Sequence, residues 1–240
     1  MSKTLFGNDM KIALCFSGQP RSFRQGYDFY KKNLLDHYDV DVIFHSWNTA
    51  DNQSYLDLYK PVLYKFDGPV TANLDKYTRR ESEIKHPKFN TYAMYYTMNE
   101  CKKLLASTTT EYNWVIRSRT DYALNVKINF ETLDNSKIYL PDDYIAPNRD
   151  IGNDQFAFGS KDAMIKYMST FENMDRYYDE GTIFNGEDMM GANLRYHSLC
   201  GTNLEYINMN NPFHGGPYNG GSHCLIREDF LKWNPGVTVW

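Results

Sequence analysis

The sequence predicts an α/β protein, with a mainly parallel central sheet flanked by helices in a single domain. Short apolar runs bounded by turn residues alternate along the chain with stretches of helical spacing, which is the pattern of βαβ units. The 240 residues, 42% hydrophobic and 23% charged, have a globular composition and can bury a large core without a disulfide or metal. Neither an internal repeat nor a Gly/Ser linker divides the chain, so one domain is the simpler prediction.

The first third of the chain carries the clearest alternation. Residues 11–16 form a short continuous apolar run, typical of a strand buried on both faces. A turn cluster at 17–21 follows, and apolar residues then recur every three or four positions over 23–35, which predicts a helix. Further strands are predicted at 40–44 and within 58–66.

The rest of the chain continues the alternation. Apolar runs predict strands at 112–116, 137–140, 155–158 and 204–209. Helical spacing predicts helices at 92–105, 161–171 and 189–199. The remaining long segments, 125–153 and the Gly-, Asn- and Pro-rich stretch 210–222, are predicted to be mostly loop.

The overall charge and hydropathy argue against two classes of partner. Twenty-six basic against thirty acidic side chains give a net charge of −4, which lacks the basic excess of a nucleic-acid binder. No apolar run approaches the length of a secretion signal or a membrane span, and the four cysteines form no C-x-x-C pair. We therefore expect a soluble, cytoplasmic protein. The 16% aromatic content suits recognition of a sugar or a base, although most of these rings serve packing.

The cluster Arg117, Arg119 and Asp121 directly follows the predicted strand 112–116. Ligands of open α/β sheets bind outside the carboxyl ends of the strands, so this cluster lies where a site is expected. Two guanidinium groups and a carboxylate suit a diphosphate with a bound cation. The alternative is a solvated loop with internal ion pairs.

A second candidate, Glu187 with Asp188, begins a predicted helix. Carboxylates are favoured there by the helix dipole and the free N–H groups, so capping alone explains them as well as a general base does. A third candidate is the turn holding Ser17, Gly18 and Arg21, where the glycine lets the backbone approach a nucleotide. Neither G-x-G-x-x-G nor a P-loop motif occurs in the chain.

Two histidines, His214 and His223, flank or lie in the Gly-rich stretch and are the ones to consider as metal ligands. An ordinary polar role in a loop is the alternative for both. His45 ends the predicted strand 40–44, where capping or packing explains it at least as well as catalysis.

In combination, these segments resemble the nucleotide-sugar glycosyltransferases of the GT-A fold. Members begin with a strand and a nucleotide-binding turn, and carry a D-x-D motif after a central strand. A strand ending in Gly follows, then an x-E-D motif that opens a helix carrying an Arg. The matching segments are 12–21, 119–121, 153–159, 186–188 with Arg195, and the strand 204–209. The Arg-x-Arg-x-Asp variant is most similar to transferases of viral and bacterial surface-glycan gene sets.

The resemblance implies a site and a reaction. Asp121 corresponds to the metal-binding aspartate, with Mn²⁺ or Mg²⁺ as cofactor, and His214 or His223 would add a ligand to the metal or diphosphate. Asp188 corresponds to the general base of an inverting transfer, with Glu187 supporting it or binding the acceptor. The donor, for which a UDP-sugar is favoured, would contact the remaining candidates, Ser17, Gly18, Arg21, Arg117, Arg119, Asp154 and Gln155.

The resemblance also implies two halves, a nucleotide-binding half at about 10–124 and an acceptor half at about 125–240. The acceptor would be a hydroxyl of a glycan or glycoconjugate. One position departs from the family pattern, because Arg119 stands where D-x-D has its first Asp. A guanidinium cannot coordinate a metal, but it can take over part of the diphosphate charge.

Two other functions remain open. A non-catalytic module that binds a carbohydrate or nucleotide would use the same aromatic-rich cleft, and measured turnover separates it from an enzyme. A Rossmann-like methyltransferase would need a Gly-rich first loop, which the single Gly18 matches poorly.

Overall fold

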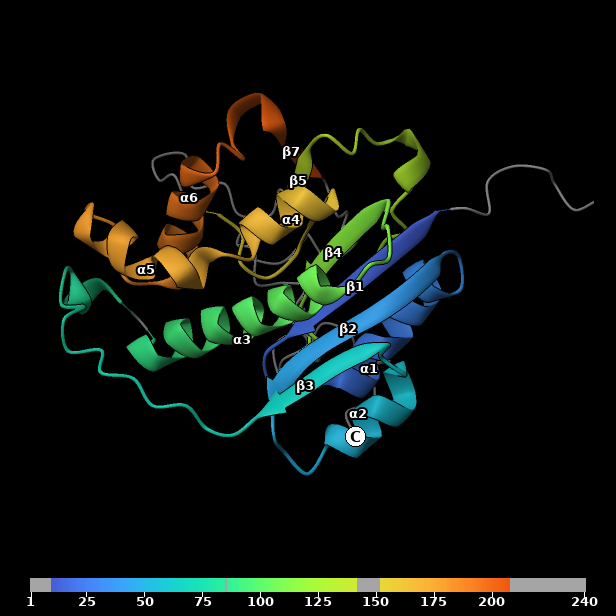
Figure 1. The fold of residues 1–240 in the computed structure, drawn as a ribbon, viewed down its shortest axis with the longest axis horizontal. Helices are drawn as coiled ribbons and strands as arrows, with labels where there is room; N and C mark the ends of the chain where they lie inside the picture. Colours follow the sequence, from blue (N-terminus) through green and yellow to red (C-terminus); the bar gives the residue numbers. More distant parts are fainter. Residues whose placement is uncertain (1–9, 85, 142–151, 208–240) are drawn as a thin grey trace, which may run out of the picture.

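A seven-stranded sheet runs through the middle of the molecule (Figure 1). The structure is a computed structural model, and it describes residues 10–84, 86–141 and 152–207. The sheet has the order β3-β2-β1-β4-β6-β5-β7, and within these residues only β6 runs antiparallel to its neighbours. The strands are β1 (Lys11–Ser17), β2 (Asp39–Trp47), β3 (Leu63–Asp67), β4 (Trp114–Ser118), β5 (Ile138–Pro141), β6 (Ala157–Gly159) and β7 (Leu204–Ile207).

Helices cover both faces of the sheet and give the molecule three layers. One face packs against α1 (Phe23–Tyr30) and α2 (Asn52–Tyr59). The other packs against α3 (Lys88–Ser107), α4 (Lys161–Tyr167), α5 (Thr170–Asp179) and α6 (Gly186–Tyr196). The predicted α/β class and the mainly parallel sheet are confirmed.

The central strand β1 shows why its sequence is a continuous apolar run. Successive side chains point to opposite faces, so Ala13 and Cys15 join the core under α3 while Leu14 and Phe16 join the core under α1 and α2. All four side chains are fully buried. Because both faces of β1 are covered, its interior carries apolar side chains, as predicted for a strand in this part of the chain.

The helices differ from the predictions in two places. The helix α2 occupies Asn52–Tyr59, where the sequence analysis assigned none, and β3 starts only at Leu63. Lys60 ends α2 with a left-handed φ of 47°, and Pro61 cannot continue a helix. The predicted helix 161–171 is two helices, because the chain turns at Ser169, whose hydroxyl donates to the carbonyl oxygen of Lys166 at 2.7 Å.

The sheet has a topological switch point between β1 and β4. From β1 the chain moves outward to β2 and β3, and it then crosses to β4 on the other side of β1. The loops that leave β1 and β4 therefore diverge around a crevice at the carboxyl edge, which is where open α/β sheets bind ligands. Thr120 joins the two loops, since its hydroxyl lies 3.2 Å from the carbonyl oxygens of both Gln19 and Arg21.

Candidate functional site

A cavity of about 370 Å³ lies at this switch point. Its walls are the loops after β1 and β4, the turn before β6, the first turn of α6 and the N-terminal half of α3. The structure thus brings together residues that are far apart in the sequence. The predicted site residues that line this cavity are Ser17, Gly18, Arg21, Arg117, Arg119, Asp154, Gln155 and Glu187.

The loop after β1 needs its glycine. Gly18 has a φ of 107°, in the left-handed region that side chains other than glycine rarely adopt. Its N–H donates to the carbonyl oxygen of His45 at 3.2 Å, which turns the chain away from the sheet. The loop then presents Arg21, whose Nε donates to Gln19 Oε1 at 2.7 Å.

Arg117 is a buried cation that has no counter-ion among the described residues. Its side chain is 0% exposed, yet no ion pair links it to a carboxylate in the described part of the chain. One Nη donates to the carbonyl oxygen of Asp154, the other lies 3.4 Å from Ser17 Oγ, and Nε has no acceptor among the described residues. Burying a charge without a partner is costly, so this guanidinium favours an anionic ligand in the cavity that it lines.

Arg119 and Asp121 form a two-pronged ion pair. Nε and Nη2 of Arg119 donate to Oδ1 and Oδ2 of Asp121, each at 2.7 Å. Burial opposes the charge on Arg119, but the attraction and hydrogen bonds of Asp121 outweigh burial and raise its pKa above the ordinary value. The alternative of an internal ion pair is therefore present here, although Arg119 itself lines the cavity.

The metal predicted at Asp121 does not fit these contacts. Both carboxylate oxygens already accept hydrogen bonds from Arg119, and the carboxylate is buried. Nor does Asp121 belong to any convergent set of three His, Cys, Asp or Glu donors within the described ranges. The other predicted ligands, His214 and His223, lie outside the described residues, so their role stays a prediction.

The turn before β6 supplies a polar wall. Asn153 Oδ1 accepts from the N–H groups of Gln155 and Phe156 at 2.8 and 3.1 Å, and Tyr167 donates to the Asn153 carbonyl oxygen at 2.7 Å. This turn holds Asp154 and Gln155 against the cavity. Gln155 Oε1 is buried and accepts no hydrogen bond from the described residues. It is a ready acceptor for a ligand hydroxyl.

The two acidic residues of α6 have different surroundings. Asn185 caps the helix by accepting from the N–H of Asp188 at 2.8 Å, and its amide donates back to Asp188 Oδ2 at 2.5 Å. Glu187 is exposed and lines the cavity. Capping thus accounts for Asp188, whereas Glu187 is the carboxylate in reach of a ligand.

An aromatic end of the cavity was missed in the sequence analysis. Trp47, the last residue of β2, and Phe89, near the start of α3, both line the cavity. Tyr96 stacks on Trp47, with ring centroids 5.5 Å apart and planes 6° from parallel. The available signal was the position of Trp47 directly after an apolar strand, since strand ends at this edge carry ligand contacts.

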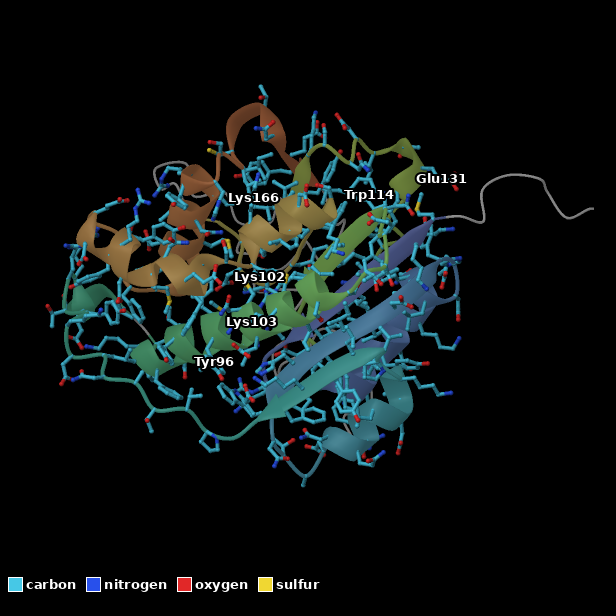
Figure 2. All side chains as sticks on the ribbon, in the orientation of Figure 1. Tyr96, Lys102, Lys103, Trp114, Glu131 and Lys166 are labelled. Atoms are coloured by element: carbon cyan, nitrogen blue, oxygen red, sulfur yellow. The ribbon has the colours of Figure 1, made fainter. Side chains whose placement is uncertain are left out.

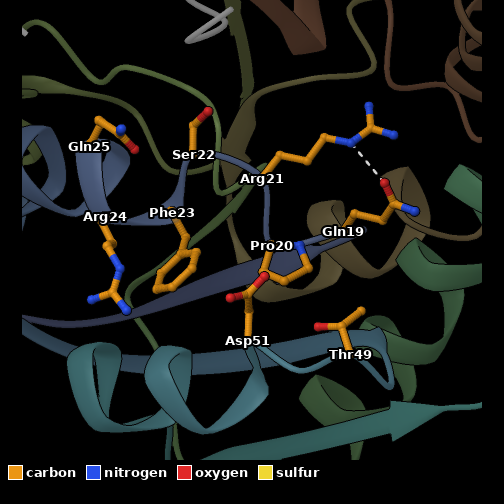
Figure 3. Close-up of a pocket in the computed structure, with 9 residues that line it drawn as sticks. All are labelled: Gln19, Pro20, Arg21, Ser22, Phe23, Arg24, Gln25, Thr49 and Asp51. Carbon is orange, nitrogen blue, oxygen red and sulfur yellow. Dashed lines mark hydrogen bonds between the residues drawn. The ribbon is translucent and has the colours of Figure 1, made fainter. Parts of the chain in front are cut away.

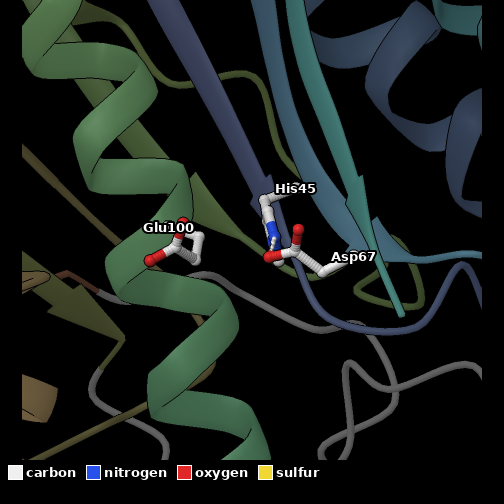
Figure 4. A group of neighbouring side chains, drawn as sticks. All are labelled: His45, Asp67 and Glu100. Atoms are coloured by element: carbon white, nitrogen blue, oxygen red, sulfur yellow. Dashed lines mark hydrogen bonds and ion pairs between the residues drawn. The ribbon is translucent and has the colours of Figure 1, made fainter. Parts of the chain in front are cut away.

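A cluster of His45, Asp67 and Glu100 is drawn in Figure 4, and its His45 ring centroid lies 6.3 Å from that of Trp47 and 6.1 Å from that of Tyr96. It is the group that could hold a metal ion among the residues the structure describes. However, the ammonium of Lys65 lies 3.0 Å from Asp67 and 2.7 Å from Glu100. Its positive charge already serves both carboxylates, so the cluster is explained as an ion-pair network.

His45 takes part in this network as a neutral side chain. Burial lowers the pKa of His45 below its ordinary value, although the carboxylate of Asp67, 3.0 Å from Nε2, opposes the shift. The α3 side chains complete the network, since Tyr96 donates to Asp67 at 2.8 Å and Lys103 to Glu100 at 2.5 Å. Figure 2 labels both on α3. These contacts account for His45 by packing and hydrogen bonding, and they hold its ring beside Trp47.

A second, more open cavity of about 420 Å³ adjoins the first (Figure 3). The two share Gln19 and Arg21, whose mutual hydrogen bond lies between them. The other lining residues are Pro20, Ser22, Phe23, Arg24, Gln25, Thr49 and Asp51.

Comparison of the chain with known protein families and with curated proteins gives no match. Among the described residues, no helix has the length and apolarity needed to cross a membrane.

Proposed function

We propose that the protein is a glycosyltransferase of GT-A type, which moves a sugar from a nucleoside diphosphate, UDP being favoured, to a hydroxyl of a glycan acceptor. The observation that carries the proposal is Arg117, a buried guanidinium at the switch point of the sheet that forms no ion pair with the described residues. An anionic ligand at that point would satisfy the charge and the orphaned Nε–H together.

The lining of the cavity combines three kinds of side chain that such a donor would use. Arg117 and Arg119 offer donors to phosphate oxygens, Gln155 offers an acceptor to a sugar hydroxyl, and Trp47 offers a flat ring to a base. A nucleoside diphosphate sugar has these three chemical parts. The cavity volume, about 370 Å³, lies within the range for small-molecule sites.

The proposed reaction is a single displacement with inversion. The acceptor oxygen forms a bond to the anomeric carbon while the bond from that carbon to the diphosphate oxygen breaks. The proton of the acceptor hydroxyl goes to the carboxylate of Glu187, and the electron pair of the broken bond stays on the diphosphate. Arg117 and Arg119 would stabilise the charge that accumulates there.

The assignment of the base to Glu187 rests on its place in the cavity wall. The role of Asp188 as general base stays a prediction, and in this proposal Asp188 completes the cap of α6 with Asn185. The proposed place of action is the cytoplasm, where the buried thiols of Cys15 and Cys101 stay reduced.

Thermal unfolding in the presence of UDP-, GDP-, dTDP- and CMP-linked ligands tests donor binding. At a hundredfold excess over Kd, a bound ligand adds about 2.7 kcal/mol of stability, which raises the Tm of a domain of this size by roughly 5–10 °C. We expect a shift with one nucleotide family and release of that nucleotide when a glycan acceptor is added. Binding without turnover would instead support the non-catalytic module, and no shift with any ligand would contradict both.

A further inference from the structure

We propose that the diphosphate is bound by guanidinium groups without a divalent cation, with Asp121 acting through Arg119 as a positioning residue. The inference rests on the proposed function for the identity of the anion. Its geometric basis is the ion pair that Arg119, which lines the cavity together with Arg117, makes with Asp121.

The ion pair uses only one edge of the guanidinium. Nε and Nη2 of Arg119 bind the two oxygens of Asp121, which fixes the plane of the group. Its Nη1 donates to none of the residues that the structure describes, and the side chain is 21% exposed in the cavity wall. A planar guanidinium that is held in one orientation and still has N–H donors available is suited to binding phosphate oxygens.

Arg117 adds a second set of donors from the same strand end. Its orphaned Nε–H is buried, and its two Nη groups are held by Asp154 and Ser17. Residues 117 and 119 lie two positions apart at the end of β4, and both reach the cavity. Two fixed guanidinium groups match the two phosphates of a diphosphate.

A divalent cation at Asp121 would have to displace this arrangement. Metal coordination would take carboxylate oxygens from Arg119 and leave a cation beside a guanidinium that had lost its partner. Breaking a buried ion pair on one side is strongly unfavourable, because the remaining charge stays desolvated. The arginine pair therefore supplies the positive charge that a metal would otherwise bring.

The test uses the whole chain and titration calorimetry with inorganic pyrophosphate in EDTA. We expect saturable binding to the wild-type protein, weakened about tenfold or more by Arg119→Lys, which keeps the charge but loses the fork. The matched control is Arg24→Lys, since Arg24 lines only the second cavity and its substitution should leave the affinity unchanged within about twofold. No saturable binding in EDTA, or no response to Arg119→Lys in a protein that still unfolds cooperatively, would overturn the inference.

A double-mutant cycle tests the role of Asp121. If Asp121 acts through Arg119, Asp121→Asn weakens pyrophosphate binding severalfold in the wild-type background and less than about twofold in the Arg119→Lys background. A metal ligand would behave differently, because the effect of Asp121→Asn would persist in the Arg119→Lys background and appear only with Mn²⁺ present. That second pattern would contradict the inference.

A comparison of pyrophosphate with UDP in EDTA separates this inference from the proposed function. Tighter binding of UDP, followed by sugar transfer in EDTA, supports both. Pyrophosphate binding that equals or exceeds UDP binding supports the arginine site but counts against a nucleotide donor. Sugar transfer that requires Mn²⁺ supports the transferase and overturns the metal-free site.

Discussion

Tyr95 donates its phenolic hydrogen to the carbonyl oxygen of Gly186 at 2.5 Å, which joins the middle of α3 to the first residue of α6. Burial raises the pKa of Tyr95 well above its ordinary value, so the hydroxyl keeps its proton and remains a donor. Gly186 also leaves room for Asp154, whose Oδ2 would lie 2.3 Å from an added Cβ. The hydrogen bond thus sets the distance between two walls of the cavity.

Tyr95→Phe should therefore affect both stability and ligand binding. Loss of one buried hydrogen bond is expected to lower the free energy of unfolding by about 1–2 kcal/mol. Donor affinity should fall as well, because α6 is no longer fixed against α3. Urea denaturation and ligand titration measure the two effects. Tyr92→Phe on the same helix is the control, since its hydroxyl bonds to no described residue and neither quantity should change.

Gly26→Ala should destabilise the protein, although alanine is the better helix former by about 1 kcal/mol. A Cβ at Gly26 would lie 2.0 Å from the carbonyl oxygen of Thr120, which is backbone and cannot swing away. Separating α1 from the loop after β4 is expected to cost about 1–3 kcal/mol net. Gly68→Ala is the matched control, because an added Cβ there meets nothing within 4 Å. Equal unfolding midpoints in urea for the two variants would refute the close approach.

Substitutions of the two acidic residues of α6, Glu187 and Asp188, should have different effects on kcat. Glu187→Gln is expected to lower kcat by about a hundredfold or more while leaving donor affinity nearly unchanged, because it removes the base but keeps the shape. Asp188→Asn retains a polar partner for Asn185 and should lower kcat far less. The reverse ranking in steady-state assays would return the role of base to Asp188.

The stability of the protein should fall in mild acid because of His45. Its pKa is lowered in the folded state, mainly by burial, so the unfolded chain binds a proton first as the pH drops. The free energy of unfolding should then decline from about pH 7 toward pH 5, by at most about 1.4 kcal/mol per pH unit for one group. His45→Gln should flatten part of this decline in urea titrations at several pH values.

A second histidine provides the comparison. The pKa of His197 is also lowered, by burial and by the nearby Lys166 and Lys102, although its side chain is less enclosed. His197→Gln should therefore remove a different part of the pH dependence of the free energy of unfolding. If His45→Gln left the slope intact and His197→Gln abolished it, the burial argument for His45 would fail.

Much of the fold was predictable because local patterns decide it. A strand with helices on both faces is mostly apolar, so the interiors of β1 and β4 are visible as short apolar runs, and β4 departs from this pattern only at Arg117 and Ser118 at its end. The helix α2 was missed because its alternating polar and apolar residues give only weak helical spacing, and its end depends on Lys60 and Pro61. The break at Ser169 was missed because helical spacing continues across it.

The sequence predicted several of the residues that line the candidate site, but it did not predict which side chains contact one another there. Strand ends and a glycine turn identify Arg117, Arg119 and Gly18, since polar residues directly after buried strands meet at one edge. The ion pair between Asp121 and Arg119 was not predicted, because residue spacing does not specify side-chain orientations. The network around His45 joins β2, β3 and α3, and contacts of that kind appear only when the tertiary structure is known.

The walls of the cavity come from segments spread between Ser17 and Glu187, on both sides of the switch point. Partial folding of either half would therefore produce no binding site, and a ligand can stabilise only the complete molecule. Bound ligand should then slow hydrogen exchange and proteolysis across the whole sheet, including strands that it never touches. Ligand binding is in this way coupled to folding, and an occupied crevice indicates that the segments which line it, from the loop after β1 to the start of α6, have come together.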